Sequence, residues 1–205
     1  QVGVKVPRGI VITENLEEEL ILDRIRDLNF PLYIKPMRAG SSFGITKVQD
    51  ISEVYDAVIL ALKHDSTVII EENIEGFEVG CAILGNGNEI IIGEVDEIEL
   101  SDGFFDFTEK YTLKSSKIHM PARIDEDMAK KVKKEAIKIY KALKCKNFAR
   151  VDMFITTDKE IVFNEVNTIP GCTSHSRYPN MLKGIGITFD EFINRAIGMV
   201  IDDDS

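Results

Sequence analysis

The spacing of apolar residues changes along the chain, and each spacing predicts a different kind of element. Near the N-terminus, five apolar residues recur at three- and four-residue intervals: Leu16, Leu20, Ile21, Ile25 and Leu28. This periodicity predicts an amphipathic helix over residues 14–29. The same periodicity predicts three further helices, over residues 52–64, 125–143 and 188–201. Ser52 is suited to cap the first of these, and Asp125 starts the second.

Short apolar or alternating runs between turn residues predict the strands. These runs cover residues 6–12, 30–36, 45–48, 67–73, 77–84, 89–95, 148–156 and 160–166. The last four form two hairpins, whereas residues 98–117 have little periodicity and are typical of a long surface loop. We therefore expect an α+β protein with two subdomains, residues 1–75 and 76–205.

Composition narrows the classes of function. The chain has 205 residues, a formal net charge of −10 and 44% hydrophobic residues, which argues against a nucleic-acid surface. Three widely spaced cysteines suggest neither disulfides nor a zinc site. No apolar run approaches the roughly 20 residues of a membrane span, and no signal peptide is visible, so we expect a cytoplasmic protein that does not bind membranes. Because the sequence starts at Gln1 in the middle of a pattern, we expect a piece of a longer chain.

The second predicted hairpin carries the candidate metal site. If Asp158 and Lys159 form a two-residue turn, Asp152 lies opposite Glu165 and Arg150 lies opposite Asn167. Opposed side chains have Cβ atoms about 4.5–5.5 Å apart, and like charges there are destabilising. A hard divalent cation such as Mg²⁺ would relieve this repulsion.

The alternative is a solvated acidic strand face. The same alternation puts Phe154 and Phe163 beside the carboxylates, which speaks against simple exposure. The metal site is therefore the favoured interpretation. It depends on a turn that lacks the glycine that would fix its type.

A glycine-rich segment, RAGSSFG at 38–44, lies between two predicted strands. Small residues let backbone N–H groups approach a phosphate, and Ser41 and Ser42 add hydroxyl donors. It is neither a Walker A loop nor a dinucleotide fingerprint, and by itself a plain hairpin loop explains it better. Lys35 on the preceding strand and Lys110 on the long loop supply cations that favour a phosphate site.

Six motifs together resemble the ATP-grasp fold of the D-alanine–D-alanine ligase family. In chain order they are YIKPMRAGSSFG, EENIEGFEVG, FFDFTEKY, ARVDMF, NEVNTIPG and TSHSRYP, and the likeness spans residues 4 to about 195. The branch resembled most is the vancomycin-resistance branch that makes D-alanyl-D-serine. The resemblance implies two α+β subdomains that grip ATP between them, with two Mg²⁺ ions for which Mn²⁺ can substitute.

The resemblance also implies roles for individual residues. Those expected to contact the nucleotide are Lys35, Ser42, Glu71, Glu72, Asn73, Ile74, Glu78, Lys110, Phe154 and Asn164. The expected metal ligands are Asp152, Glu165 and Asn167, in agreement with the hairpin register. Ser41 and Tyr111 resemble members of a hydrogen-bonded set that closes a lid carrying Lys110. Arg150 matches the arginine that stabilises the tetrahedral intermediate, and Gly171 and Ser176 lie where the second substrate's carboxylate is held.

The implied reaction joins D-alanine to a second D-amino acid through a D-alanyl phosphate. Tyr111 stands where the branch that uses D-lactate is expected to have histidine, which favours an amino acid. Arg177 stands where ordinary D-alanine–D-alanine ligases have an apolar residue, and an arginine there favours D-serine. The alternative for Arg177 is a surface salt bridge.

Other functions remain open. The chain could belong to an ordinary D-alanine–D-alanine ligase of cell-wall synthesis, to a non-catalytic nucleotide-binding module, or to a structural domain with an acidic face. The family also has an N-terminal domain that binds the first D-alanine, and its full-length members are expected to be homodimers. Without that domain we expect these 205 residues to be a poor ligase or an inactive one.

Overall fold

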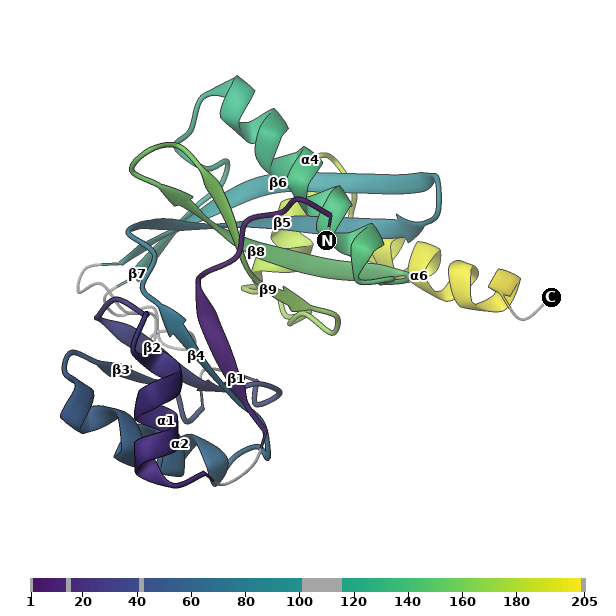
Figure 1. Cartoon of the computed structure of the whole chain (residues 1–205). Coiled ribbons are helices and arrows are strands. Elements are labelled where there is room, and N and C mark those ends of the chain that lie inside the picture. Colours follow the sequence, from purple (N-terminus) through teal and green to yellow (C-terminus); the bar gives the residue numbers. More distant parts are fainter. Residues whose placement is uncertain (1, 14–15, 41–42, 101–115, 204–205) are drawn as a thin grey trace. The chain divides into compact units, whose positions relative to one another are not determined.

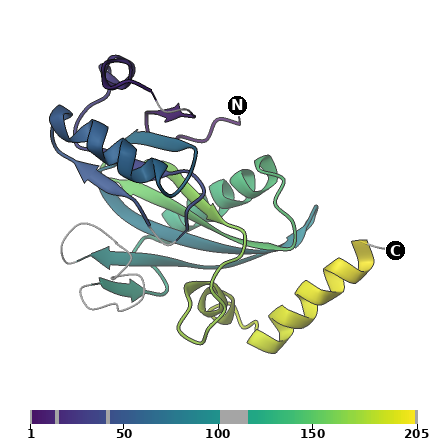
Figure 2. The same cartoon turned by 90° about the horizontal axis from the view of Figure 1, so that it is seen from below.

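A computed structural model describes residues 2–13, 16–40, 43–100 and 116–203 (Figures 1 and 2). The chain divides into two compact units. One contains Pro7–Glu75; the other contains Gly76–Glu99 and the chain from Lys117 onward, with the N-terminal residues up to Val6. Each unit is described by itself.

The Pro7–Glu75 unit has an antiparallel four-stranded sheet in the order β1-β4-β2-β3. Its strands are β1 (Gly9–Ile12), β2 (Leu32–Pro36), β3 (Thr46–Val48) and β4 (Val68–Glu72). The helices α1 (Glu18–Ile25) and α2 (Val54–Leu62) pack on one face of the sheet. Fully buried Ile21, Val58, Leu32 and Ile70 belong to this core. Burying these side chains excludes water from one face and leaves the other face available for polar residues.

The start of α2 differs from the prediction. A short 3₁₀ turn, η1 (Ile51–Glu53), precedes the helix. Asp50, and not Ser52, caps this turn, because the Asp50 carboxylate accepts hydrogen bonds from the Ser52 N–H at 2.9 Å and the Ser52 hydroxyl at 2.8 Å. Glu53 completes the capping box by accepting from the Asp50 N–H at 3.3 Å.

The second unit is built on an antiparallel five-stranded sheet in the order β7-β6-β5-β8-β9. Its strands are β5 (Gly76–Asn86), β6 (Glu89–Leu100), β7 (Ser116–His119), β8 (Phe148–Thr156) and β9 (Ile161–Asn167). Both predicted hairpins are present, and the first is longer at both ends than predicted. The described residues of this unit also form the helices α4 (Glu126–Ala142), α5 (Arg177–Lys183) and α6 (Phe189–Asp203).

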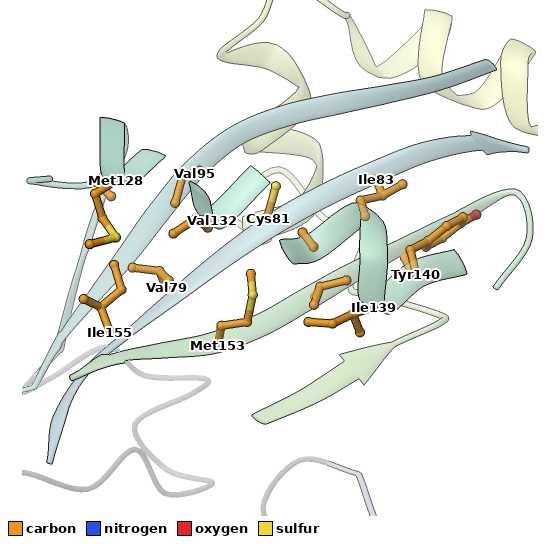
Figure 3. Close-up of a cluster of buried hydrophobic side chains, with 14 residues drawn as sticks. Val79, Cys81, Ile83, Val95, Met128, Val132, Ile139, Tyr140, Met153 and Ile155 are labelled. Atoms are coloured by element: carbon orange, nitrogen blue, oxygen red, sulfur yellow. The ribbon is translucent and has the colours of Figure 1, made fainter. Parts of the chain in front are cut away.

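The two faces of this sheet have separate apolar cores. On one face, Val132 and Ile139 of α4 pack against Val79 of β5 and Met153 of β8 (Figure 3). On the other face, Tyr178 and Met181 of α5 and Phe192 of α6 pack against Ala82 and Leu84 of β5. The predicted helix over residues 125–143 is confirmed, with the Asp125 carboxylate accepting from the Met128 N–H at 2.8 Å. The sequence did not predict α5, the short helix that begins at Arg177.

Within the part of the chain that the structure describes, none of the helices has the length and apolar character needed to cross a membrane.

The core on the α4 face makes a prediction about stability. Ile83 is completely buried, whereas Ile169 is 89% exposed. Ile83→Ala should lower the free energy of unfolding by about 2–5 kcal/mol, because it removes buried methylene contacts and leaves a cavity. Ile169→Ala, the matched control, should change it by less than about 0.5 kcal/mol. Urea denaturation of both variants measures the difference, and equal losses would contradict this assignment of the core.

Candidate functional site

The β8–β9 hairpin confirms the predicted pairing of the metal residues but not the predicted turn. Asp152 pairs with Glu165, and Arg150 pairs with Asn167. The turn has three residues, 157–159, because the Thr156 N–H donates to the Glu160 carbonyl at 2.9 Å and Lys159 has a φ of 61°. The extra turn residue shifts the pairing by one. A bulge at Asn164 shifts it back before Glu165.

The bulge changes which aromatic residues share the carboxylate face. Phe163 pairs with Met153 and packs against the α4-side core. The prediction that Phe163 accompanies Glu165 is therefore wrong, because the bulge reverses the alternation between these two positions. Phe154 instead lies directly opposite Glu78 on the neighbouring strand β5. Of the two phenylalanines, Phe154 therefore lies beside Glu78, the carboxylate expected to contact the nucleotide, and Phe163 does not.

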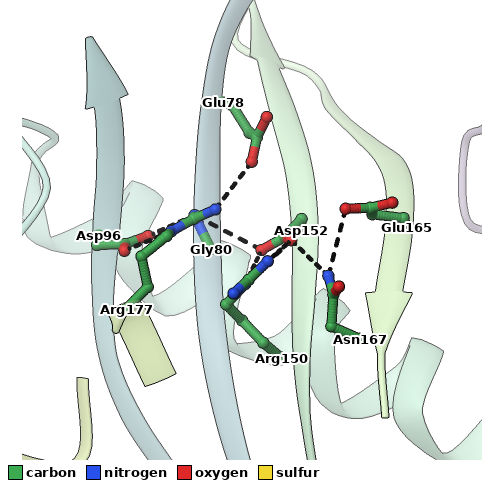
Figure 4. Close-up of polar contacts among 8 residues, drawn as sticks. All are labelled: Glu78, Gly80, Asp96, Arg150, Asp152, Glu165, Asn167 and Arg177. Carbon is green, nitrogen blue, oxygen red and sulfur yellow. Dashed lines mark hydrogen bonds and ion pairs between the residues drawn. The ribbon is translucent and has the colours of Figure 1, made fainter. Parts of the chain in front are cut away.

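Asp152 is the centre of a hydrogen-bonded cluster (Figure 4). Its side chain is 1% exposed, and Arg150 donates to both carboxylate oxygens, from Nε at 2.8 and 3.0 Å and from Nη2 at 2.7 Å. Asn167 donates from Nδ2 to Asp152 at 2.8 Å and to Glu165 at 3.3 Å. The amide therefore links the two opposed carboxylates.

Arg177, at the first residue of α5, is buried against the same face of the sheet. It donates to Asp96 from Nε at 2.8 Å and from Nη2 at 2.7 Å, and to Glu78 from Nη1 at 3.0 Å. Nη2 also lies 3.5 Å from Asp152. Burial lowers the pKa of Arg177, but the charges of Asp96 and Asp152 outweigh this and raise the pKa well above its usual value. With 8% of its side chain exposed, Arg177 does not make a surface salt bridge.

Gly80 makes room for this arginine. It pairs with Asp96 on one side and with Asp152 on the other, so three neighbouring strands place two carboxylates around a residue without a side chain. A Cβ at Gly80 would clash with Nη2 of Arg177 and would lie 2.8 Å from the Asp96 carboxylate. The guanidinium therefore lies over the glycine and bridges the two acids.

This cluster gathers acidic side chains around two guanidinium groups. Four carboxylates, of Glu78, Asp96, Asp152 and Glu165, face the two guanidinium groups of Arg150 and Arg177 in Figure 4. Buried or partly buried carboxylates need compensating charge, because the low-dielectric surroundings raise the cost of an unpaired one. Arg150 and Arg177 supply such compensation within the described part of the chain.

The donor set indicates which cation would fit. Two carboxylates and an amide oxygen are hard ligands, which suit Mg²⁺ sharing its remaining positions with water or phosphate. Asn167 presents Nδ2 to both carboxylates, and turning its amide plane would present Oδ1 instead. Among residues 2–13, 16–40, 43–100 and 116–203, no three His, Cys, Asp or Glu side chains gather in a metal-binding group. An Asp–Glu–Asn set lies outside that pattern.

The candidate carboxylate-binding residues are neighbours. Ser176 precedes α5, and its Oγ accepts from the Thr173 N–H at 3.0 Å and lies 2.8 Å from the Thr173 hydroxyl. A Cβ on Gly171 would lie 2.9 Å from that same Oγ. The loop before α5 therefore brings Gly171 and Ser176 together next to Arg177.

In the Pro7–Glu75 unit, Lys35 and Glu71 form an ion pair. Nζ of Lys35 lies 2.7 Å from Oε2 of Glu71, across β2 and β4. Glu72 accepts from the Asn29 N–H at 2.9 Å and forms an ion pair with Arg8 at 3.3 Å. Its carboxylate therefore connects β4 to two other segments of this unit. The Asn73 N–H donates to the Pro31 carbonyl at 3.1 Å. Ile74 is half-buried at the end of this unit.

Four predicted site residues, Ser41, Ser42, Lys110 and Tyr111, lie outside the described residues. Two members of the cluster were missed by the sequence analysis, Gly80 and Asp96. The run EVDEIEL contained a signal, since alternation alone puts Asp96 on the opposite face from Val95 and Glu97. The arginine that makes Asp96 informative is on a helix 81 positions later, and no local pattern connects them.

Comparisons with solved structures define the fold. The crystal structure of VanG D-Ala:D-Ser ligase from Enterococcus faecalis matches with a TM-score of 0.87 and 59% identity, covering 97% of this chain and 57% of that chain. The structure of the D-alanine-D-alanine ligase from Coxiella burnetii matches with a TM-score of 0.84 and 27% identity, covering 98% and 53%. The fold is thus the α+β ATP-grasp fold, as predicted.

The sequence comparisons give the family. The model of the family described as D-ala D-ala ligase C-terminus matches residues 2–198. Vancomycin C-type resistance protein VanC2 from Enterococcus casseliflavus is 43% identical over 197 residues, which are 96% of this chain and 56% of that protein. The chain belongs to the D-alanine–D-alanine ligase C-terminal family, and it spans somewhat over half the length of such relatives.

Because Arg177 lies over Gly80, we expect a substitution at Gly80 to change the stability of the protein. Gly80→Ala should displace the guanidinium and lower the free energy of unfolding by about 1–3 kcal/mol, because the added methyl overpacks a buried ion pair. Gly198 on α6 has open space around its Cβ position, so Gly198→Ala should instead stabilise the protein by about 0.5–1 kcal/mol. Thermal unfolding followed by circular dichroism compares the two. A Gly80→Ala variant as stable as the wild type would contradict the packing described.

Proposed function

We propose that this chain is the nucleotide- and metal-binding part of an ATP-dependent D-alanine–D-serine ligase. The whole protein would join the carboxylate of D-alanine to the amine of D-serine and so supply a dipeptide for peptidoglycan precursors, in the context of vancomycin resistance. The observation that carries the proposal is the pair of opposed carboxylates, Asp152 and Glu165, joined by Asn167 and flanked by Arg150.

In this proposal Asp152, Glu165 and Asn167 hold Mg²⁺. Such an ion, when bound, neutralises charge on the phosphates during phosphoryl transfer. Two ions are expected from the family, with Mn²⁺ as a possible substitute. The proposal uses oxygen donors that the hairpin already places side by side, so the site would need little rearrangement of the backbone.

The reaction proceeds in two steps. A carboxylate oxygen of D-alanine attacks the γ-phosphorus of ATP, and the bond between this phosphorus and the β,γ-bridging oxygen breaks. ADP is released, and the product of this step is D-alanyl phosphate. The neutral amine of the second substrate then attacks the acyl carbon, and loss of phosphate and a proton leaves the peptide bond. Arg150 holds a positive charge at this face, 2.7 Å from Asp152, and would donate to the oxygen of the tetrahedral intermediate.

Other residues would bind the nucleotide and exclude water. Glu78 would accept from the ribose hydroxyls, with Phe154 directly opposite it and Asn164 at the bulge of β9. Lys35, and the segment 71–74, belong to the other unit, and their assignment to the same nucleotide stays a prediction, as does the division at residue 75. Ser41, Ser42, Lys110 and Tyr111 stay predicted contributors to the phosphate site and the lid, which would protect the acyl phosphate from hydrolysis.

The choice of D-serine rests on Arg177 and its partner. Arg177 is a buried cation fixed by Asp96 and Glu78, close to Ser176 and Gly171, the proposed carboxylate-binding residues. A serine hydroxyl both donates and accepts hydrogen bonds, and an arginine–aspartate pair offers both an N–H and a carboxylate oxygen. A site built for that hydroxyl discriminates against D-alanine, which lacks it. The likeness to VanG, named a D-Ala:D-Ser ligase, supports the same choice.

The alternative, ligation of two D-alanines, is favoured by the match to the Coxiella burnetii D-alanine-D-alanine ligase. The cytoplasmic location and homodimeric state of the full-length protein stay predictions.

Metal-dependent nucleotide binding tests the site. Replacing both Asp152 and Glu165 by alanine should weaken ATP binding in the presence of Mg²⁺ by at least about tenfold, which corresponds to about 1.4 kcal/mol, because the cation loses its carboxylate ligands. Isothermal titration calorimetry with and without Mg²⁺ measures this. The matched control replaces Asp158 and Glu89, two exposed acids at the turns of the same unit, and should leave the affinity unchanged. Equal Mg²⁺-dependent affinities in the wild type and the site variant would reject the site.

Product analysis tests the second substrate. The full-length enzyme, given ATP and equal concentrations of D-alanine and D-serine, should form D-alanyl-D-serine in excess of D-alanyl-D-alanine by a factor of about 10 or more, since unpaired polar groups in the site penalise D-alanine. Chromatographic separation of the dipeptides measures the ratio. Exclusive formation of D-alanyl-D-alanine would replace D-serine by the alternative and leave the ligase assignment intact.

A further inference from the structure

The four-stranded sheet carries polar and aromatic side chains on the face that points away from α1 and α2. In β2, fully buried Ile34 belongs to the core under these helices, so its neighbours Tyr33 and Lys35 lie on the opposite face. Tyr33 pairs with Glu71 of β4 on one side and with Lys47 of β3 on the other. Three neighbouring strands therefore place an aromatic ring between an acid and a lysine.

The ammonium group of Lys35 is held by two partners on this face. Its Nζ lies 2.7 Å from Oε2 of Glu71 and 5.8 Å from the centroid of the Tyr33 ring. Lys35 pairs with Ile69 across the strands and not with Glu71, so its side chain runs back along its own strand to reach both partners. Such diagonal neighbours on one face of a sheet are within the reach of a long side chain.

The same ring lies close to a second lysine. Nζ of Lys47 lies 5.4 Å from the centroid of the Tyr33 ring. An ammonium group within about 6 Å of a ring centroid is attracted by the negative charge on the face of the ring. Two ammonium groups repel each other, so the attraction that Tyr33 exerts on both favours their presence on one face of the sheet.

We propose that Tyr33 is a positioning residue for Lys35, and that its ring holds the Lys35 ammonium in place for the phosphates of a bound nucleotide. This proposal rests on the proposed function, which assigns Lys35 to those phosphates. Tyr33 does not touch the nucleotide in this account. It acts on nucleotide binding through the position of the ammonium group.

The physical reason is that the ring orders the lysine and leaves its hydrogen-bond donors available. A lysine side chain loses conformational entropy when it is ordered, and a side chain ordered before the ligand arrives loses less on binding. An ammonium group has three N–H donors, and Glu71 accepts one of them at 2.7 Å. The attraction to the face of a ring is electrostatic and needs no directed hydrogen bond, so donors remain for phosphate oxygens.

Tyr33→Leu removes the ring, and Tyr33→Phe keeps the ring and removes only the hydroxyl. The matched control is Tyr55→Leu, since Tyr55 is a partly buried tyrosine of α2 that packs against the core of the same unit. Nuclear magnetic resonance on the 205-residue chain supplies two measurements. One is the chemical shift of the Lys35 methylene protons next to Nζ, identified by their loss in Lys35→Gln; the other is the affinity for ATP with Mg²⁺ and for adenosine, by titration.

In the wild type, the Lys35 methylene protons should be shifted upfield, because protons over the face of an aromatic ring are shielded. Tyr33→Leu should abolish this shift and weaken ATP binding by about threefold to fivefold, while adenosine binding changes by less than about 1.5-fold. Tyr33→Phe and Tyr55→Leu should keep both the shift and the ATP affinity. This pattern would assign the effect to the ring and not to the hydroxyl or to general stability.

Three results would overturn the proposal. One is a wild-type Lys35 without the upfield shift, which decides even if Tyr33→Leu does not fold. Another is a folded Tyr33→Leu variant with unchanged ATP affinity, or with equal losses for ATP and adenosine. The third is a Tyr33→Phe variant that loses as much ATP affinity as Tyr33→Leu.

The outcomes also separate this proposal from the proposed function. A wild-type chain that binds no ATP would overturn both. A wild-type chain whose ATP binding is weakened by Lys35→Gln but not by Tyr33→Leu would overturn the role of Tyr33 alone.

Discussion

The repulsion between Asp152 and Glu165 is the constraint on which the rest of the site depends. Two adjacent strands hold these carboxylates directly opposite each other, and Asp152 has almost no access to water. Such an arrangement persists only where positive groups compensate it. Arg150 and Arg177 supply positive charge from within the chain, and the proposed divalent cation would bind at the two carboxylates.

The fold supports this cluster from both faces of the sheet. The core under α4 fixes the β5 and β8 strands, and the core under α5 fixes the helix that starts with Arg177. Gly80, between the two strands that carry Asp96 and Asp152, leaves the space that the guanidinium fills. A local substitution at this glycine would therefore act on two acids and one helix at once.

Local sequence patterns predicted the pairing of the β8–β9 hairpin. They did not predict contacts between segments that are distant in the sequence. Alternation placed Asp152 opposite Glu165 correctly, although the predicted turn was one residue too short, because the bulge at Asn164 compensates the extra turn residue. Alternation also put Phe163 on the wrong face for the same reason. Helix α5 and the Asp96–Arg177 pair were not predicted, since a seven-residue helix has little periodicity and its partner is far away in the sequence.

The most direct test of the shared cation is to locate it. A crystal of this chain grown with Mn²⁺ and ADP, and measured for anomalous scattering, should show a metal peak between the carboxylates of Asp152 and Glu165, at about 2.0–2.3 Å from an oxygen of each. An anomalous peak elsewhere, or bound ADP with no metal at these two side chains, would contradict the account.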